Sequence, residues 1–568
     1  MDSSEAERAV AVWGDDRGQE TGALRPGDRL AWWLLPILLL ALPTLTYPPG
    51  VDQATFTLVG DGWLDGFLPY ADRWDVKPPG IFLLYGLARA LMGHTWWAIR
   101  VLDVVWTMAT CVLLFRLGRR LGPRTGQLAA FGYGLHVMVQ PPWELGQTDG
   151  MTGLLVVAAA SLFASALHAP SGRKQRARAT LQTLVAGLLL GGAILLKLPA
   201  ALFLLVPVGM LALQIGPRGR LDRTHLRLLA ALALGVFLPL SGTVLYFAFV
   251  GGLQMFLETL FVWAPRLAWG GARAPWSALF SNGVVLGHRN LWSVPLLAGG
   301  ALVAVVLESI RGNLRKLAIP LLLLGAGLLM TTIQFKFYRY HWMACLPGLA
   351  LLAGHGLGEA WSAVRGVKEQ WQRRVATLSF VVGALAALPL DMARPFAATG
   401  WLVARISGRI DEVGYYQRFF QASSAESYNF AEDLVVGRYV RDHAPAGSTL
   451  FVWGFEPPIY IESGCAPASR FIYHYPVAAR WAPPRWRTTL LSDLQAQDPT
   501  YFVVSHKGSA PWMTGRSGNT ADLLATVPGL ETFLRRGYNL ETTIGAFDLY
   551  RRRETAPGAG AVETSGSP

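Results

Sequence analysis

The residues with the clearest potential for chemistry are charged side chains that stand beside long apolar runs. The segment from Tyr47 to Gly80 follows one such run and contains five aspartates, a lysine and several aromatic residues. Asp52 lies early in this segment, in the sequence PPGVDQATF. A carboxylate at a membrane surface can accept a proton from a hydroxyl group, which makes Asp52 a candidate general base. It could equally cap the helix that follows it.

Asp149, in the sequence QTDGMTGLL, presents the same two alternatives at the start of another apolar run. A carboxylate at the start of a helix accepts backbone N–H bonds, and such a cap also fixes the direction of the side chain. We expect capping to be the preferred role of Asp149 and proton transfer to be the preferred role of Asp52. Both aspartates remain candidate catalytic residues.

Cationic side chains beside other apolar runs could bind a phosphate group. Lys77 precedes two prolines, which hold its backbone extended and project the ammonium group from the chain. Lys197 interrupts a long apolar stretch, and a lysine at that depth needs a partner. Both lysines could instead be interfacial anchors that extend toward lipid headgroups.

A third cationic stretch, QFKFYRYHW from Gln334 to Trp342, places three potential cations among five aromatic residues. An interfacial aromatic belt with ordinary anchors has a similar composition. A histidine and two cations packed this closely fit a phosphate site better, with a tyrosine hydroxyl as a further hydrogen-bond donor. The candidate phosphate-binding residues are therefore Lys77, Lys197, Lys336, Arg339, Tyr340 and His341.

The sequence disfavours several other kinds of site. Its three cysteines form neither a disulfide framework nor a CxxC metal motif. It has no HExxH motif and no Gly-rich nucleotide loop of the Walker type. We therefore expect no cofactor and no metal site; a divalent ion could bridge Asp52 and Asp149, but nothing in the sequence supports one.

Membrane helices must position these residues. Of the 568 residues, 52% are hydrophobic and 15% are charged, whereas soluble globular chains have about 25% charged residues. The net charge of +13 lies mostly in short basic clusters between apolar runs, as the positive-inside rule describes. Membrane lipids are therefore expected partners, and nucleic acid is not.

The apolar runs predict eleven membrane-spanning helices. The basic clusters all follow even-numbered runs, which places the N-terminus in the cytoplasm and the C-terminus outside. Because basic clusters flank 178–215, the chain must turn near Lys197, where Pro199 favours a break. The loop 251–289 is long enough to hold amphipathic or re-entrant helices. The predicted spans are 30–46, 95–115, 125–141, 150–167, 178–196, 198–215, 228–250, 290–308, 317–334, 342–358 and 376–392.

The predicted fold is an all-α polytopic membrane domain followed by a small extracytoplasmic α/β domain. The α/β domain is predicted from helical periodicity in two segments and from three strand-like runs. The helical segments are 431–443 and 521–536, and the strand-like runs are 449–453, 501–505 and 547–550. The predicted divisions are a cytoplasmic segment 1–29 without a cleaved signal peptide, a transmembrane catalytic domain 30–395, the α/β domain 396–553 and a disordered tail 554–568.

These motifs resemble those of the GT-C superfamily of polytopic membrane glycosyltransferases, especially bacterial relatives of protein O-mannosyltransferases and aminoarabinose transferases. The resemblance rests on GVDQATF, LPYADRWDVKPPG, ILLKLPA and FKFYRYHWMACLPGLALLAG, in this order. The C-terminal stretch that begins RYVRDHAPAGSTLFVWGF is also similar to a recurrent one in such proteins. Together these motifs extend from about residue 30 to 552.

The resemblance implies a multi-pass enzyme of the inner (plasma) membrane that transfers a sugar from a polyprenyl-phosphate donor to an acceptor hydroxyl on a lipid, glycan or protein. Transfer would take place on the outer face, with Asp52 as the base or acceptor-orienting carboxylate. The groups expected to balance the leaving phosphate are Lys77, Lys197, Arg339 and His341. Protein mannosyltransferases typically carry Asp-Glu in the first loop, whereas Gln53 follows Asp52 here, which leaves the acceptor open.

Two other functions fit a polytopic chain. A polymerase or ligase of lipid-linked glycans has an overlapping architecture and is the second interpretation. A secondary transporter ranks third, because it would place its ionisable groups near the middle of the membrane on broken helices, often with repeat symmetry.

Overall fold

The computed structural model describes residues 30–122, 124–170, 172–216, 219–270, 294–388, 390–420 and 428–553. The predicted N-terminal segment and C-terminal tail lie outside these residues, as does the part 271–289 of the loop 251–289. The chain divides into two units. The first comprises Met1–Ala71 and Asp75–Phe419, and the second comprises Asp72–Trp74 and Phe420–Pro568.

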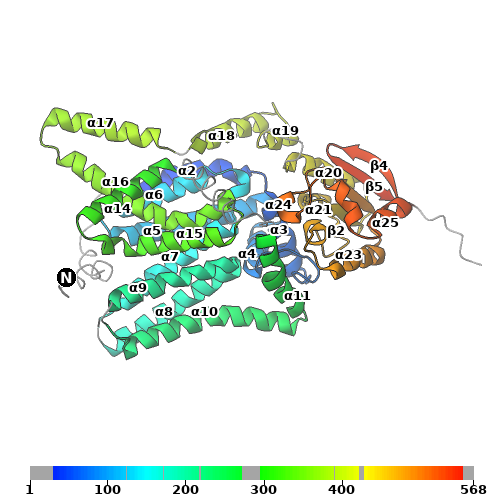
Figure 1. The fold of residues 1–568 in the computed structure, drawn as a ribbon. Coiled ribbons are helices and arrows are strands. Elements are labelled where there is room, and N and C mark those ends of the chain that lie inside the picture. Colours follow the sequence, from blue (N-terminus) through cyan, green and yellow to red (C-terminus); the bar gives the residue numbers. More distant parts are fainter. Residues whose placement is uncertain are drawn as a thin grey trace, which may run out of the picture. The chain divides into compact units, whose positions relative to one another are not determined.

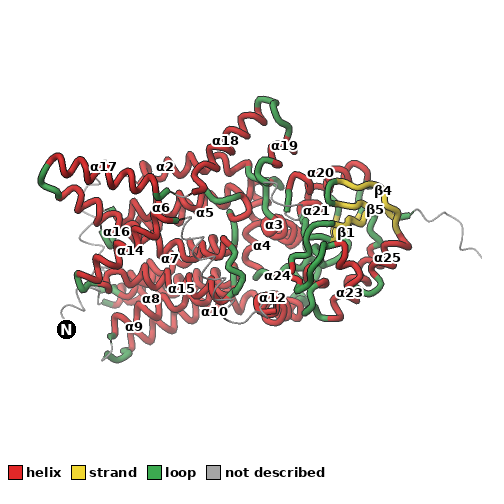
Figure 2. Tube along the Cα trace, turned by 45° about the horizontal axis from the view of Figure 1, so that its top comes forward, coloured by secondary structure: helices red, strands yellow, loops and turns green. Residues whose placement is uncertain are grey.

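The first unit consists of helices, many of which run side by side (Figures 1 and 2). Short 3₁₀ segments join several of them, including η2 (Leu42–Thr46), η3 (Pro142–Glu144), η4 (Leu198–Leu204) and η7 (Arg339–Cys345). The α-helices are α2 (Leu30–Ala41), α3 (Val51–Leu64), α4 (Pro79–Met92), α5 (Trp96–Arg119), α6 (Thr125–Met138), α7 (Thr148–Leu167), α8 (Arg173–Leu196), α9 (Leu205–Ile215), α10 (Arg223–Phe249), α11 (Leu253–Leu257), α12 (Ala264–Gly270), α14 (Pro295–Ile310), α15 (Ala318–Ile333), α16 (Leu346–Gly366), α17 (Gln370–Ala386), α18 (Ala393–Ile406) and α19 (Glu412–Gln417).

By length and composition, six helices among the described residues could cross a membrane, and a bent pair could form a seventh. These helices support seven of the eleven predicted spans if the bent pair is one span. The predicted spans 125–141, 290–308 and 376–392 contain helices of 14, 16 and 17 residues, at or below the lower limit for crossing a bilayer. The six are Trp96–Arg119, Thr148–Leu167, Arg173–Leu196, Leu198–Ile215, Arg223–Phe249 and Leu314–Ile333, and the bent pair is Trp32–Thr46 with Val51–Leu64.

The predicted break at Lys197 is confirmed. Helix α8 ends at Leu196, Lys197 has an extended backbone, and η4 begins at the next residue with Pro199 in its first turn. Helices α8 and α10 pack closely at Gly187, where an added Cβ would lie 2.3 Å from the carbonyl oxygen of Leu232. Small residues allow such close approach between membrane helices. Lys197 thus lies at the end of α8, a helix whose position is set by its close packing against α10.

The segment after the first apolar run contains helix α3 and leads into α4. Asp52 is the second residue of α3, and Lys77 stands two residues before α4. Helices α3 and α4 touch at Gly60, where a Cβ would lie 2.4 Å from the carbonyl oxygen of Phe82. This contact fixes the two helix starts, and with them Asp52 and Lys77, relative to each other.

The second unit has a mixed five-stranded sheet of order β2-β1-β3-β5-β4 with helices around it (Figure 2). Strand β1 is parallel to β2 and β3, whereas β5 is antiparallel to β3 and β4. Trp74 also belongs to this unit, because its backbone N–H donates to the carbonyl of Arg470 at 2.8 Å. The elements are α20 (Phe430–His443), β1 (Thr449–Trp453), α21 (Pro458–Ser463), β2 (Ala466–Pro467), α22 (Tyr475–Ala478), α23 (Pro484–Gln497), β3 (Tyr501–Ser505), α24 (Pro511–Thr514), η9 (Ala521–Thr526), α25 (Leu530–Gly537), β4 (Tyr538–Ile544) and β5 (Phe547–Arg552).

The predicted α/β character of this region is confirmed. Helix 431–443 and the three predicted strands occur within a few residues of their expected bounds, while 521–536 is divided into η9 and α25. Strand β4 and helix α23 were not predicted. Strand β4 has mostly exposed or half-buried residues, so it lacks the apolar run that marks a buried strand.

Candidate active site

A buried ion pair between α7 and the end of α8 lies at the centre of the candidate site. The Nζ of Lys197 lies 2.5 Å from Oδ2 of Asp149, and Nε2 of Gln334 donates to Oδ1 at 3.1 Å. The residue at the N-cap of α7 is Gln147, and no side chain caps this helix. The expected capping role of Asp149 is therefore wrong, because its buried carboxylate binds an ammonium group instead.

Asp52 and Lys77 form a second, looser pair. Oδ1 of Asp52 lies 4.0 Å from Nζ of Lys77, and the two side chains are 24% and 14% exposed. Asp52 does not cap α3: the N-cap is Gly50, whose N–H donates to Oε1 of Gln53 at 2.6 Å. The carboxylate of Asp52 is therefore available to react with a group arriving from solvent.

The backbone of Lys77 is held on both sides. Its N–H donates to Oδ2 of Asp75 at 3.2 Å, and its carbonyl accepts a bond from the Tyr70 hydroxyl at 2.8 Å. Burial alone would lower the pKa of Lys77, but the nearby carboxylates of Asp52, Asp75 and Asp149 raise it. Lys77 is thus a fixed cation. Its interaction with Asp149 also shows that the two lysine–aspartate pairs belong to one site.

The stretch between α15 and α16 adds aromatic rings to this site. The ammonium of Lys197 lies 5.3 Å from the centre of the Tyr340 ring. This ring packs edge-on against the ring of His341, and the two ring centres are 4.7 Å apart. Phe335 and Phe337 both have positive φ angles, 53° and 49°, which bulky side chains rarely adopt. Such backbone strain is typical of functional sites.

His341 differs from its predicted role. Burial, followed by the charges of Lys197, Lys77 and Lys336, lowers its pKa well below the usual range. The imidazole is therefore neutral, so His341 does not supply the expected positive charge. It retains a ring N–H and can still donate a hydrogen bond.

Lys336 and Tyr340 keep their protons at neutral pH. Burial lowers the pKa of Lys336 to about 8, so most of this residue is still charged near pH 7. Burial, followed by the negative charge of Asp52, raises the pKa of Tyr340 well above its usual value. Tyr340 can therefore act as a hydrogen-bond donor beside the lysines.

Arg339 is engaged elsewhere. Its guanidinium pairs with the carboxylate of Asp391, which also binds Arg394 at 2.7 Å. Arg339 is close enough to lower the pKa of Glu144, although burial outweighs this effect and raises that pKa to about 7. The structure therefore brings together Asp52, Asp149, Lys77, Lys197, Lys336, Tyr340 and His341, with Arg339 at the margin.

Gln53 supports the site in a way that the sequence did not reveal. Its buried amide donates to the carbonyls of Pro142, at 2.8 Å, and Leu145, and its oxygen also accepts from Arg100 at 3.0 Å. A glutamate here could not donate to the two carbonyls unless it were protonated. This network is a physical reason for glutamine at a position where some relatives carry glutamate.

The geometry supports acid–base chemistry on an anionic molecule. A partly exposed carboxylate can accept a proton, and fixed ammonium groups beside it can stabilise developing negative charge. Within the described ranges, no group of three or more His, Cys, Asp or Glu side chains is arranged to hold a metal ion.

Comparison with known proteins connects this geometry to a family. Residues 76–242, which include Lys77, Asp149 and Lys197, match the family described as dolichyl-phosphate-mannose-protein mannosyltransferase. The crystal structure of ArnT from Cupriavidus metallidurans bound to undecaprenyl phosphate aligns over 93% of this chain and 98% of that chain, with a TM-score of 0.55 and 14% identity. The chain therefore has the fold of ArnT, and its residues 76–242 are similar to the mannosyltransferase family.

Other structures also align with this chain. ArnT in the apo state covers 92% of this chain and 97% of its own, with a TM-score of 0.54 and 15% identity. The structure of the oligosaccharyltransferase AglB from Archaeoglobus fulgidus aligns over 92% of this chain and 74% of its own chain, with a TM-score of 0.44 and 13% identity. No curated protein sequence matches the chain. The resemblance seen in the sequence motifs is thus confirmed for the fold by ArnT, and the family match over residues 76–242 supports it.

Proposed function

We propose that this protein transfers a sugar from a polyprenyl-phosphate donor to an acceptor hydroxyl. The observation that carries the proposal is the juxtaposition of a partly exposed carboxylate, Asp52, with the ammonium groups of Lys77 and Lys197. A phosphate ester requires cations at the leaving oxygen, and an incoming hydroxyl requires a base. Both requirements are met within one cluster.

In the proposed reaction, Asp52 accepts the proton of the acceptor hydroxyl as its oxygen forms a bond to the anomeric carbon. The bond from that carbon to the phosphate oxygen breaks, and polyprenyl phosphate leaves with the electron pair. Lys77 and Lys336 balance the charge of this phosphate, and the Tyr340 hydroxyl donates a hydrogen bond to it.

Asp149 has a different role in this proposal from Asp52. It is fully buried and is bonded to Lys197 and Gln334, so it positions the ammonium group rather than taking a proton. His341, which is neutral, contributes a hydrogen bond. Arg339 acts indirectly, because its charge is already matched by Asp391.

We further propose that the site faces away from the cytoplasm in the inner membrane, with the N-terminus inside and the C-terminus outside. The basic clusters of the connecting loops support this orientation. The site described here belongs to the transmembrane catalytic domain 30–395, and the acceptor would approach at Asp52.

The proposal can be tested with purified protein in liposomes that contain labelled polyprenyl-phosphate hexoses or pentoses. We expect labelled sugar to pass to a component of a total membrane extract, with release of polyprenyl phosphate. Replacing Lys77 by Met should lower the rate by roughly 100- to 1000-fold, as loss of a well-placed charge stabiliser does. Lys368→Met, at an exposed lysine in the loop after α16, is the matched control.

Two results would contradict the proposal. Uptake of a solute without any glycosyl transfer would identify a transporter. Growth of the labelled product into a polymer would identify the second interpretation, a polymerase or ligase of lipid-linked glycans.

A further inference from the structure

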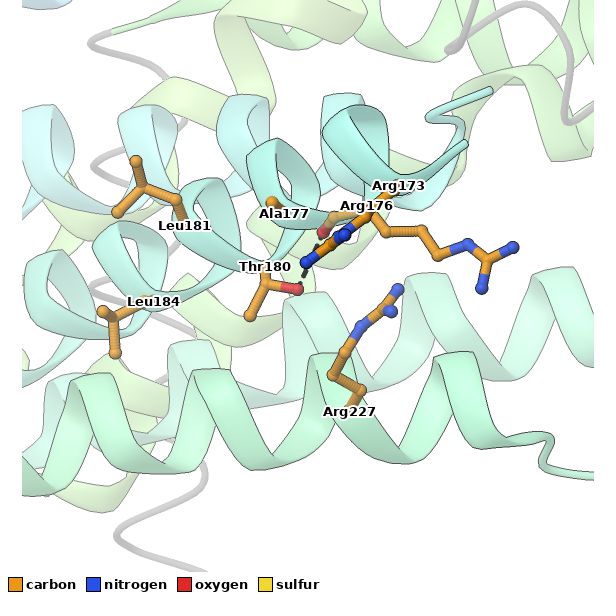
Figure 3. Close-up of a pocket in the computed structure, with 7 residues that line it drawn as sticks. All are labelled: Arg173, Arg176, Ala177, Thr180, Leu181, Leu184 and Arg227. Atoms are coloured by element: carbon orange, nitrogen blue, oxygen red, sulfur yellow. Dashed lines mark hydrogen bonds between the residues drawn. The ribbon is translucent and has the colours of Figure 1, made fainter. Parts of the chain in front are cut away.

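A pocket of about 780 Å³ lies between the N-terminal ends of α8 and α10 (Figure 3). Lys197 stands just beyond the other end of α8, and a helix of 24 residues is roughly 36 Å long. The pocket is therefore separate from the candidate active site. Its lining residues are Arg173, Arg176, Ala177, Thr180, Leu181, Leu184 and Arg227.

Three arginines give this pocket its charge. Figure 3 shows the side chain of Arg227 extending from α10 toward the arginines of α8. None of the seven lining residues is acidic. Among the described residues, the buried Nε of Arg227 has no hydrogen-bond partner. Like charges gathered around an opening repel one another, so a bound anion would stabilise the arrangement.

A phosphate group is the anion that fits best. The guanidinium group presents a planar set of N–H donors that matches phosphate oxygens in a bidentate manner. The first turn of α8 adds the positive end of a helix dipole, and its N-cap residue Gly172 supplies no side-chain cap. The arginines and the helix terminus therefore favour the same ligand chemistry.

The apolar part of the pocket indicates that the phosphate belongs to a lipid. Leu181 and Leu184 continue from the arginines along α8, and Leu181 is 60% exposed. Both α8 and α10 are long and apolar enough to cross a membrane, so their ends lie at headgroup depth. A free phosphate would contact the arginines alone, whereas a lipid would also place acyl chains on the leucines.

We propose that this pocket binds the phosphate headgroup of an anionic membrane lipid. Ordinary positive-inside arginines also lie at helix ends, but they need no cavity. Here the arginines of two tightly packed helices line one cavity, as in basic pockets between membrane helices that hold anionic headgroups.

Native mass spectrometry of the full-length protein, released from bilayers of phosphatidylglycerol and phosphatidylcholine, tests this proposal. Wild-type protein should retain phosphatidylglycerol in preference to phosphatidylcholine. Loss of one guanidinium should weaken retention about fivefold, so Arg173→Gln/Arg176→Gln/Arg227→Gln should abolish the preference. Arg365→Gln/Arg373→Gln/Arg374→Gln removes the same charge from exposed positions elsewhere and should keep it.

A second variant guards against misfolding of the triple variant. Thr180→Trp fills the pocket without changing its charge and should also abolish retention. Equal retention of the two lipids by wild-type protein, or equal loss in the control variant, would overturn the proposal. Displacement of the lipid by inorganic phosphate at low millimolar concentration would show that the pocket takes a free anion, which would also overturn it.

Discussion

Each unit of the protein contains a buried lysine paired with a buried aspartate. In the first unit, Lys197 lies 2.5 Å from Asp149. In the second, Lys507 lies 3.6 Å from Asp433 and 3.2 Å from Glu432. Both lysines also lie over an aromatic ring. The local pattern is nearly the same, and the surroundings differ.

The first pair has a second ammonium group near it, whereas the second pair has further carboxylates near it. Lys197 belongs to a cluster with Asp52 and Lys77, whose side chains are partly exposed. Lys507 and Glu456, which follow β3 and β1, are both buried, and Glu456 accepts a hydrogen bond from Ser505 at 3.2 Å. A buried ion pair alone is therefore weak evidence for an active site. The distinguishing feature is a second ammonium group, that of Lys77, beside a partly exposed carboxylate.

The largest expected effect is on the second pair. Lys507→Met leaves buried carboxylates without a compensating charge, which should cost about 3–5 kcal/mol of stability. Burial raises the pKa values of Asp433 and Glu456, so the stability that their protonated forms provide is present at low pH and is lost as pH rises through the raised values. The loss in the variant should therefore be greater at pH 8 than at pH 5.

Thermal unfolding of the full-length protein, followed by tryptophan fluorescence, measures this loss. Arg551→Met is the matched control, because its pair with Glu541 is partly exposed and should contribute less than about 1 kcal/mol. Equal losses in the two variants would show that the Lys507 cluster is not the stabilising element described here.

Paired double variants test whether the two ion pairs differ in function. Removing both partners avoids an uncompensated buried charge, so Asp433→Asn/Lys507→Met and Asp149→Asn/Lys197→Met should each recover much of the stability that the lysine variant loses. Glycosyl transfer per folded molecule should be normal in the first double variant. In the second it should stay roughly 100- to 1000-fold low. Recovery of transfer in both double variants would show that the Asp149–Lys197 pair also has only a structural role.

Gln53→Glu tests the framework of the site rather than its charges. The variant loses two donors to buried carbonyls, which should cost about 1–3 kcal/mol of stability. Gln372→Glu, at an exposed position of α17, is the control and should have almost no effect. Similar thermal midpoints for the two variants would contradict the hydrogen-bond network assigned to Gln53.

The smallest predicted effect is a pH dependence that only the first unit should show. The pKa of Lys336 is about 8, so its positive charge is lost as pH rises through that value. The KM for the polyprenyl-phosphate donor should therefore increase about fivefold between pH 7 and pH 9. In Lys336→Met this increase should disappear. An unchanged pH profile in the variant would remove Lys336 from donor binding.

The sequence predicted those features that depend on local pattern. The break at Lys197 followed from a proline and from charge clusters on both sides, and strands β1 and β3 followed from short apolar runs. The structure supports up to seven of the eleven predicted spans, because an apolar run does not reveal how many of its residues form one continuous helix.

Contacts between distant residues could not be predicted. Gln334 reaches Asp149 across 185 positions of sequence, and Arg339 pairs with Asp391 across 52. The sequence gives the residue types but not these pairings, so it misassigned capping to Asp149 and a charge to His341. Gln53 was noticed only as a departure from the family pattern, because three of its four hydrogen-bond partners, Arg100, Pro142 and Leu145, lie far from it in the sequence.

The central claim is that Asp52 is the catalytic base of a lipid-dependent glycosyltransferase. The most direct test is single-turnover transfer from labelled polyprenyl-phosphate sugar by Asp52→Asn, compared with Asp65→Asn at the exposed end of α3. We expect transfer by Asp52→Asn to fall by at least about 100-fold with membrane insertion and donor binding intact, and transfer by Asp65→Asn to stay normal. Near-normal transfer by Asp52→Asn would contradict the claim.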